Sequence, residues 1–317
     1  MQKEVLVHAE HLYRYYGNTC AVSDVSFELA KGEVMGFLGP NGAGKSTTMQ
    51  IITGNLAPSA GSITVHGIDL LDSPKRAKLE IGYLPEQPPV YRELTVVEYL
   101  KYCARLHRIS HSHISKAITA AMDRCGLGEV SQRLIGNLSK GYQQRVGIAQ
   151  AILHTPAVVI LDEPTVGLDP IQIREIRRLI RELGEEHGII LSTHILPEVQ
   201  ATCNRVQIIH QGKLVFADSI AGLEQRMDAT SLIAGFRTAP NVEALQQVAG
   251  ITRTEPLPDG RMRIHYADTD PSEALIEQAV ASQWRLHELS PERRTLEQIF
   301  IELTCSEHPA GDAEAAA

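Results

Sequence analysis

Short apolar runs that end in polar residues recur along the first two thirds of the chain. The runs at 33–38, 157–161 and 188–192 have the length of strands, and each leads directly into a polar or glycine-rich cluster. In open α/β sheets, ligands bind outside the carboxyl ends of the parallel strands. The three polar clusters are therefore predicted to share one site.

The stretch between the first two of these runs has mostly helical character, from about 95 to 151. Thr95, with Glu98 three residues later, predicts a capping box that opens a helix through Leu106. Ser139 stands where an N-cap would precede a helix over 141–153. We predict a helical subdomain, at about 88–151, inserted in a first domain over 1–224.

The pattern changes after about residue 225. It predicts a β-α-β-β-α-β order, which is typical of a small ferredoxin-like α+β domain over 225–305. The predicted ranges are strand 231–237, helix 241–249, strands 251–257 and 261–267, helix 272–282 and strand 284–290. Asp270-Pro271 would start the second helix, and Thr295 would open a last amphipathic helix. The tail 306–317 is predicted to be disordered.

Composition narrows the class of protein. With 317 residues, 43% hydrophobic and 21% charged, the chain matches a soluble globular protein of about two domains. Its net charge of −8 argues against binding nucleic acid or anionic lipid over the whole surface. No apolar run approaches the ~18 residues of a membrane-spanning helix. Neither a secretory signal nor paired cysteines are recognisable, which indicates a cytoplasmic protein whose membrane role would depend on a partner.

A phosphate-binding loop follows the first run. Gly39-x4-Gly44-Lys45-Ser46 matches G-x-x-x-x-G-K-[ST], in which backbone N–H groups surround phosphates, the lysine reaches the β and γ oxygens and the serine binds Mg²⁺. The predicted contacts to nucleotide come from Gly39, Pro40, Asn41, Gly42, Ala43, Gly44, Lys45, Ser46 and Thr47.

Two carboxylates and a histidine follow the other two runs. Asp162 is placed to hold Mg²⁺ through water, and Glu163 to face the water that attacks the γ-phosphate. The alternative is a solvated strand end, which the phosphate loop in the same chain makes improbable. His194 taken alone would be an ordinary surface histidine, but its position at a strand end makes it a site candidate.

These motifs together resemble the nucleotide-binding subunit of an ABC transporter over roughly residues 4–220. The resemblance rests on the phosphate loop, Asp162-Glu163, His194, Gly167-Leu168-Asp169 and the signature Leu138-Ser139-Lys140-Gly141-Tyr142-Gln143-Gln144-Arg145, which occur in family order. It implies an α/β P-loop NTPase cassette. With the appended domain, the chain is most similar to the exporter branch that includes drug-resistance and gliding-motility ATPases.

The resemblance also implies roles for single residues. Tyr16 would stack on adenine, with ordinary strand packing as its alternative. Ser139 and Gly141 would cap the γ-phosphate bound by the other protomer, and Asp169 would link the two composite sites. His194 would contact the γ-phosphate and hold the geometry around Glu163.

Two departures from the family pattern stand out. The signature has Lys140 in place of its first glycine and Tyr142 in place of glutamine, while Ser139 and Gly141 are retained. The family has a Mg²⁺-sensing glutamine in this segment. If the segment is aligned without a gap from Tyr91 backwards, Glu86 occupies the position of that glutamine, and Gln87 lies one residue later. The sequence leaves both open, with Gln87 as the candidate metal contact.

The resulting hypothesis is an ATPase that uses ATP and Mg²⁺ and pairs with a second nucleotide-binding subunit, its own copy. Separate membrane-spanning permeases would complete an exporter, and the ATPase would lie peripherally on the cytoplasmic face of the membrane. No nucleic-acid partner is expected. The alternative is a soluble ABC ATPase acting on nucleic acid or ribosomes, and a binding module without turnover conflicts with the presence of both Glu163 and His194.

Overall fold

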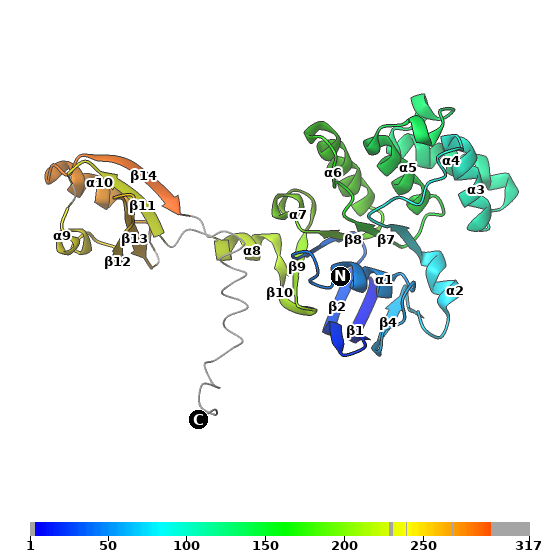
Figure 1. The fold of residues 1–317 in the computed structure, drawn as a ribbon, viewed down its shortest axis with the longest axis horizontal. Helices are drawn as coiled ribbons and strands as arrows, with labels where there is room; N and C mark the ends of the chain where they lie inside the picture. The colour runs from blue at the N-terminus through cyan, green and yellow to red at the C-terminus, as the bar shows by residue number, and fades with distance from the viewer. Residues whose placement is uncertain (1–3, 228–230, 239, 268, 293–317) are drawn as a thin grey trace. The chain divides into compact units, whose positions relative to one another are not determined.

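The computed structural model describes residues 4–227, 231–238, 240–267 and 269–292. The chain divides into two compact units, Met1–Ile220 and Ala221–Ala317 (Figure 1). The division falls four residues before residue 224, where the sequence placed the end of the first domain. The predicted helix opening at Thr295 and the predicted tail 306–317 lie outside the described residues.

A six-stranded sheet forms the centre of the first unit, in the order β10-β9-β3-β8-β7-β6. All neighbours are parallel except β10 and β9. Strands β3, β7 and β8 are buried at every residue, which explains their continuous apolar runs. The strands are β3 (Val34–Leu38), β6 (Ile81–Leu84), β7 (Val158–Asp162), β8 (Gly188–Thr193), β9 (Arg205–His210) and β10 (Lys213–Ser219).

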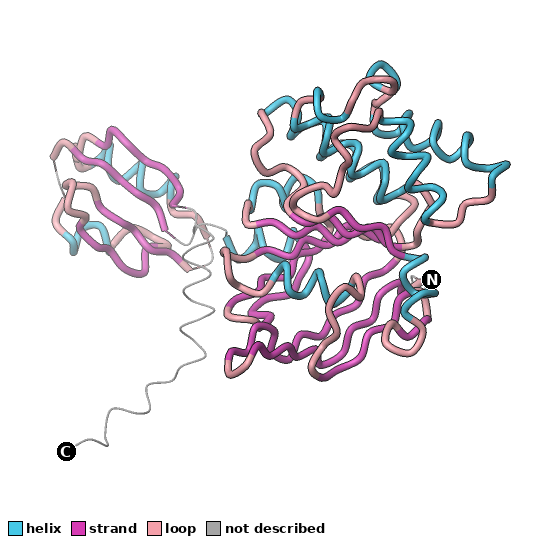
Figure 2. The backbone as a smooth tube through the Cα atoms, turned by 45° about the vertical axis from the view of Figure 1, so that its right-hand side comes forward, coloured by secondary structure: helices cyan, strands magenta, loops and turns pink. Residues whose placement is uncertain are grey.

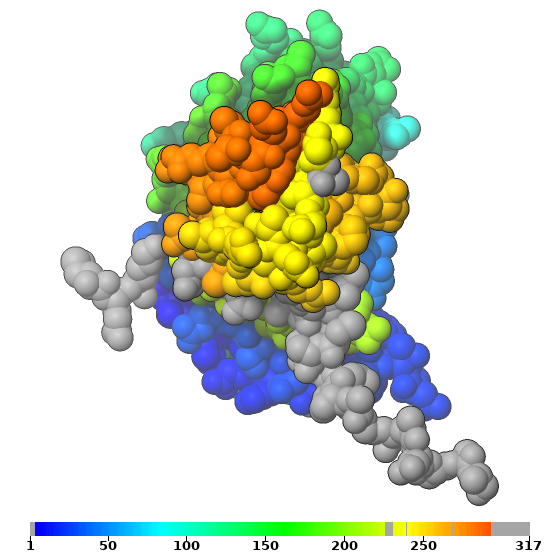
Figure 3. All heavy atoms as spheres, turned by 90° about the vertical axis from the view of Figure 1, so that its left-hand side faces the viewer, coloured from blue at the N-terminus to red at the C-terminus, as the bar shows by residue number. Residues whose placement is uncertain are grey.

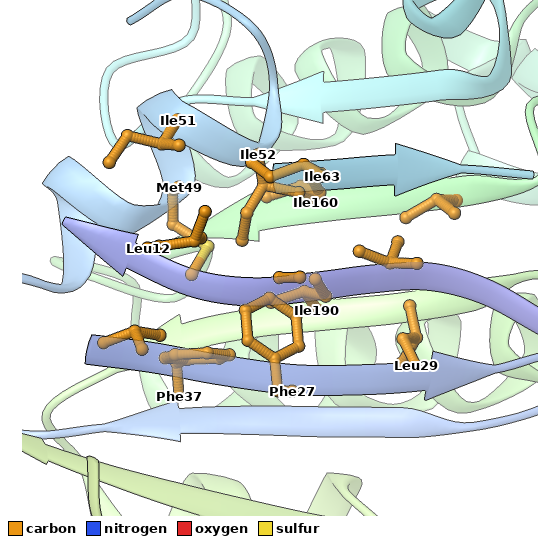
Figure 4. Close-up of a cluster of buried hydrophobic side chains, with 14 of the residues drawn as sticks. Leu12, Phe27, Leu29, Phe37, Met49, Ile51, Ile52, Ile63, Ile160 and Ile190 are labelled. Atoms are coloured by element: carbon orange, nitrogen blue, oxygen red, sulfur yellow. The ribbon is translucent and has the colours of Figure 1, made fainter. Parts of the chain in front are cut away.

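A second, antiparallel sheet in the order β2-β1-β4-β5 packs with helix α1 (Lys45–Ile52) on one side of the central sheet (Figures 1 and 2). The shared core includes Phe27 and Phe37, whose rings meet edge to face at 5.1 Å between centroids, with Met49 of α1 (Figure 4). The antiparallel strands are β1 (Val5–Tyr16), β2 (Thr19–Ala30), β4 (Ala60–Val65) and β5 (Ile68–Asp69).

The helices formed by residues 96–184 lie on the other side of the central sheet (Figures 1 and 2). The capping box is confirmed, because Thr95 N–H donates to Glu98 Oε2 at 2.9 Å and Glu98 N–H donates to Thr95 Oγ1 at 3.3 Å. The helix capped by Ser139 begins one residue before the predicted start. The helices and 3₁₀ turns of this unit are α2 (Pro74–Ala77), Lys78–Glu80, α3 (Val96–Leu106), α4 (His111–Cys125), Gly128–Val130, Ile135–Asn137, α5 (Lys140–Ile152), α6 (Pro170–Gly184) and α7 (Leu196–Thr202).

The second unit begins within α8 (Ile220–Met227), and the elements after this helix have the predicted β-α-β-β-α-β order. Its antiparallel sheet runs β12-β13-β11-β14, the ferredoxin-like arrangement. The sequence predicted Asp270 as the cap of α10 and Pro271 in its first turn, but the N-cap is Pro271 and the helix begins at Ser272. Asp270 Oδ1 still accepts from Ser272 N–H, at 2.9 Å. Figure 3 shows this unit, yellow to orange, as a closely packed body. Its elements are β11 (Ser231–Phe236), α9 (Val242–Gln246), β12 (Ile251–Pro256), β13 (Met262–Tyr266), α10 (Ser272–Ala281) and β14 (Leu286–Glu292).

Among the residues that the structure describes, no helix combines the length and the apolar character that a membrane crossing requires.

Candidate active site

The loop between β3 and α1 is shaped by glycines. A Cβ at Gly39 would lie 2.4 Å from the carbonyl oxygen of Ile209, and Gly44 has a φ of 107°, which side chains rarely adopt. Gly44 occupies the N-cap of α1, and no side chain caps the helix. The first N–H groups of α1 therefore have no intrahelical acceptor and are available to an anion.

Lys45 lies under this loop and is only 6% exposed. Its Nζ donates to the carbonyl oxygens of Gly39, at 2.9 Å, and Pro40, at 3.2 Å. It lies 3.8 Å from Glu163 Oε1. Burial lowers the pKa of the Lys45 ammonium, and the negative charge of Glu163 acts against that shift. The loop thus places a cation beside a carboxylate.

The two carboxylates lie at the end of β7. Asp162 is its last residue, and burial raises the pKa of Asp162 while the nearby hydroxyls of Ser192 and Ser46 lower it. Glu163 has a left-handed φ of 48°, and its N–H donates to Ser192 O at 2.9 Å. Asp162 Oδ1 and Glu163 Oε2 are buried without a hydrogen-bond partner among the described residues. Such oxygens are suited to a cation or a bound water.

His194 completes the cluster from the neighbouring strand. It follows β8 directly, and its Nδ1 lies 2.9 Å from Glu163 Oε1, at hydrogen-bonding distance. If the Nδ1–H donates to the carboxylate, Nε2 is left as the other hydrogen-bonding atom of the ring. The side chain of His194 is 42% exposed, so the ring is accessible.

A cavity of about 320 Å³ joins these parts. The polar clusters after β3, β7 and β8 line one site, as their sequence positions predicted. The sequence did not indicate Ala21, from β2, or Val166, because neither carries chemistry or belongs to a local motif. The lining residues are Ala21, Asn41, Gly42, Gly44, Lys45, Ser46, Thr47, Glu86, Glu163, Val166 and His194.

Nine of the predicted site residues do not line this cavity. Four of the nine belong to motifs whose other members do line it, namely Gly39, Pro40 and Ala43 of the phosphate loop and Asp162 before Glu163. Gln87 is a fifth, whereas its neighbour Glu86 does line the cavity. Tyr16 is 48% exposed, and the guanidinium of Arg14 lies 4.8 Å from its ring centroid, so the ring is not packed inside its sheet. The other three are Ser139, Gly141 and Asp169, which lie at the starts of helices.

These helix starts have local partners. Ser139 Oγ accepts from Tyr142 N–H at 3.4 Å. A Cβ at Gly141 would lie 2.5 Å from Cδ of Gln172, so α5 and α6 approach closely here. Asp169 Oδ1 accepts from the N–H groups of Ile171 and Gln172 at 2.9 and 3.0 Å. Within one chain, they line none of the cavity around Lys45.

The site residues fit a magnesium ion held jointly with phosphates. Mg²⁺ commonly uses one or two carboxylates together with substrate phosphates and waters. The unpartnered Oδ1 of Asp162 and the adjacent Ser46 supply such a set. No group of three or more His, Cys, Asp or Glu arranged for a metal ion occurs in the described part of the chain.

Comparisons with known proteins agree with this geometry. A family model described as "ABC transporter" matches residues 22–166, from β2 to beyond Glu163. The uncharacterized ABC transporter ATP-binding protein YdbJ of Bacillus subtilis is 33% identical over 312 residues, covering 98% of each chain. This chain belongs to the ABC transporter ATP-binding proteins.

Other members of the family support the same assignment. The bacitracin transport ATP-binding protein BcrA of Bacillus licheniformis is 39% identical over 212 residues, covering 66% of this chain and 68% of BcrA. Among solved structures, cbiO1 from Clostridium perfringens, described as part of the ABC transporter complex cbiONQ, has a TM-score of 0.65 and 28% identity. The match covers 70% of this chain and 92% of cbiO1. The fold is an ABC cassette, and the protein is an ABC ATPase.

Proposed function

We propose that this ABC ATPase hydrolyses Mg·ATP to power an exporter, acting as a homodimer with separate permease subunits on the cytoplasmic face of the membrane. The observation that carries the proposal is the meeting of Lys45, Glu163 and His194 in one cavity at the start of α1. That arrangement supplies phosphate binding, a carboxylate for water and a second polar group at the same place.

Each side chain has a role in this reaction. Lys45 neutralises the β and γ oxygens of ATP, and the N–H groups at the start of α1 bind its phosphates. Glu163 orients the attacking water and accepts its proton. His194 holds the Glu163 carboxylate from the other side and contacts the γ-phosphate. Ser46 and Asp162 would hold Mg²⁺, with Glu86 or Gln87 nearby, and the ion would supply charge neutralisation at the phosphates.

Residues outside the cavity complete the site in a dimer. Ser139 and Gly141 would cap the γ-phosphate bound by the partner, with the start of α5 adding its positive dipole end. Asp169, at the start of α6, would connect the two sites, and Tyr16 would offer the face not occupied by Arg14 to adenine. Closure of the dimer then assembles the catalytic arrangement and provides the mechanical step.

Export is supported by the relative named for bacitracin transport. A permease requires a contact surface, and the best candidate is a hollow of about 510 Å³ between the helical subdomain and residues 53–85 of the cassette. Its wall includes Tyr91, Tyr102 and Leu106, which are 46%, 41% and 63% exposed. Pro85 lines the same hollow and precedes Glu86, which lines the phosphate cavity. A permease bound in the hollow would therefore be linked to the reaction site through the adjacent residues Pro85 and Glu86.

Lys45→Ala tests nucleotide binding. The substitution removes the cation that faces the phosphates, so we expect ATP affinity to fall by on the order of a hundredfold and hydrolysis to be lost. Titration with a fluorescent ATP analogue measures the affinity. Lys116→Ala, on the exposed face of α4, is the control and should bind like the wild type. Equal affinity in the Lys45 variant would contradict the phosphate-loop assignment.

Tyr102→Glu tests the permease contact. A charge in the aromatic hollow should weaken co-purification with the permease by about tenfold or more and remove its stimulation of hydrolysis, with basal hydrolysis unchanged. Leu71→Glu alters an exposed apolar residue elsewhere and should leave co-purification intact. Normal permease binding by the Tyr102 variant would exclude this surface.

The identity of the co-purifying chain decides between the proposal and its alternative. Purification from native membranes should recover a multi-spanning permease with the ATPase. Recovery of ribosomes or nucleic acid without a permease would favour a soluble ABC ATPase instead.

A further inference from the structure

Helix α7 carries a buried carboxylate that the reaction described above does not use. Glu198 is fully buried, and no Lys, Arg or His forms an ion pair with it within the part of the chain that the structure describes. Its Oε1 accepts a hydrogen bond from the hydroxyl of Thr165. Its Oε2 accepts one from the hydroxyl of Thr193 at 2.6 Å. Burying a polar group has a desolvation cost, which these two hydrogen bonds offset.

The two threonines belong to the two catalytic segments. Thr165 lies two residues after Glu163, and Thr193 immediately precedes His194. Each threonine hydroxyl donates to a different oxygen of the Glu198 carboxyl group. One side chain therefore ties together the segments that carry the proposed catalytic groups.

The carboxylate is attached to a fixed part of the fold. The next residue, Val199, packs so closely on β3 that a Cβ at Gly36 would lie 2.7 Å from Val199 Cγ1. Helix α7 therefore packs directly against β3 and cannot move closer to this strand. In Figure 1, α7 lies beside the end of β8.

Both tied segments have defined local geometry. The Thr193 hydroxyl also accepts a hydrogen bond from Ile195 N–H at 3.2 Å. This bond joins the residues before and after His194 and so fixes the backbone around it. In the other segment, Val166 N–H donates to Glu163 O at 3.3 Å and Leu168 N–H donates to Thr165 O at 3.2 Å. These turns follow Glu163, whose left-handed φ is unfavourable for a residue with a side chain and must be held by its surroundings.

We propose that Glu198 is a positioning residue which, through Thr165 and Thr193, holds Glu163 and His194 at their 2.9 Å contact. The inference rests on the proposed roles of Glu163 and His194 in hydrolysis. Loss of either hydroxyl would let one catalytic segment shift relative to the other. A displacement of about 1 Å at a reacting centre can cost on the order of a hundredfold in rate.

Matched threonine substitutions in the full-length protein test this. Thr165→Val and Thr193→Val keep the shape of the side chain and remove the hydroxyl, whereas Thr165→Ser and Thr193→Ser keep the hydroxyl. We expect kcat for ATP to fall roughly tenfold to a hundredfold in each valine variant. The dissociation constant of ATP should stay within about twofold, and the serine variants should retain wild-type kcat. Rates are expressed per nucleotide-binding site, so that unfolded protein does not contribute.

Three results would overturn the proposal. They are wild-type kcat in both valine variants, equal losses in valine and serine variants, and a loss of ATP affinity as large as the loss of rate. The wild type measured beside them separates this inference from the proposed function. A wild type that does not hydrolyse ATP contradicts the proposed function, whereas turnover that survives both valine substitutions contradicts only the role of Glu198.

Discussion

Glu163→Gln is expected to abolish steady-state ATP hydrolysis while ATP binding persists. The substitution removes the carboxylate that accepts a proton from the attacking water but retains Lys45, Ser46 and Asp162. Loss of a general base costs on the order of a hundredfold to ten-thousandfold in rate. Because ATP then remains intact, the protein should accumulate as an ATP-bound dimer, which size-exclusion chromatography with and without ATP detects.

A matched variant separates this effect from a general change of charge. Glu185→Gln neutralises an exposed carboxylate just after α6 and should hydrolyse ATP at the wild-type rate. Near-wild-type turnover in the Glu163 variant, assayed with its permease, would exclude Glu163 as the group that activates water.

Mixing two inactive variants is expected to restore hydrolysis. Ser139→Arg should block closure over the partner's nucleotide, and Lys45→Ala should prevent binding to its own phosphate loop. A heterodimer of the two places both lesions in one composite site and leaves the other site complete. Each homodimer has no complete site, so activity should appear only in the mixture. If the sites act independently, the heterodimer works at up to about half the wild-type rate, and an equal mixture that pairs at random works at up to about a quarter of it.

Crosslinking checks the same arrangement when the two sites are so tightly coupled that one cannot act alone. Cysteines introduced by Asn41→Cys and Ser139→Cys, in separate chains, should form an ATP-dependent link between protomers. Asn41 lines the cavity, whereas Ser139 lies outside it in the same chain, and the shared-site arrangement expects the partner's Ser139 to approach this cavity. Crosslinks only within a chain, or none with ATP, would contradict the shared site.

Much of the candidate site could be predicted because its chemistry is local in sequence. The phosphate loop, Asp162-Glu163 and His194 each follow a strand-sized apolar run, and parallel strands align their carboxyl ends. Their convergence in one cavity required only that β3, β8 and β7 be neighbours, which they are. The capping box at Thr95 and the β-α-β-β-α-β order could also be predicted from the sequence, because helix caps and hydrophobic periodicity depend on residues only a few positions apart.

Other features escaped prediction although their signal was present. Strand β2 alternates, with Val25, Phe27 and Leu29 buried and the residues between them exposed, which is typical of a strand with one solvated face. The sequence also left open whether Glu86 or Gln87 fills the Mg²⁺-sensing position. The structure places Glu86 on the cavity wall, because the direction of a side chain after β6 depends on how the segment packs rather than on its spacing from Tyr91.

The sequence by itself determined the three strands that lead into the site, the capped helices, the order of elements in the second unit and the groups with recognisable chemistry, since these depend on hydrophobic period and on motifs of fewer than ten residues. Only the tertiary structure decided which distant groups meet. Glu198 contacts Thr165, 33 positions away, and His194 contacts Glu163, 31 positions away. Burial of Lys45 beside Glu163 likewise depends on β3 and β7 lying on either side of β8. Contacts of this kind arise from strand pairing and helix packing, and the chain between the partners carries no local pattern that encodes them.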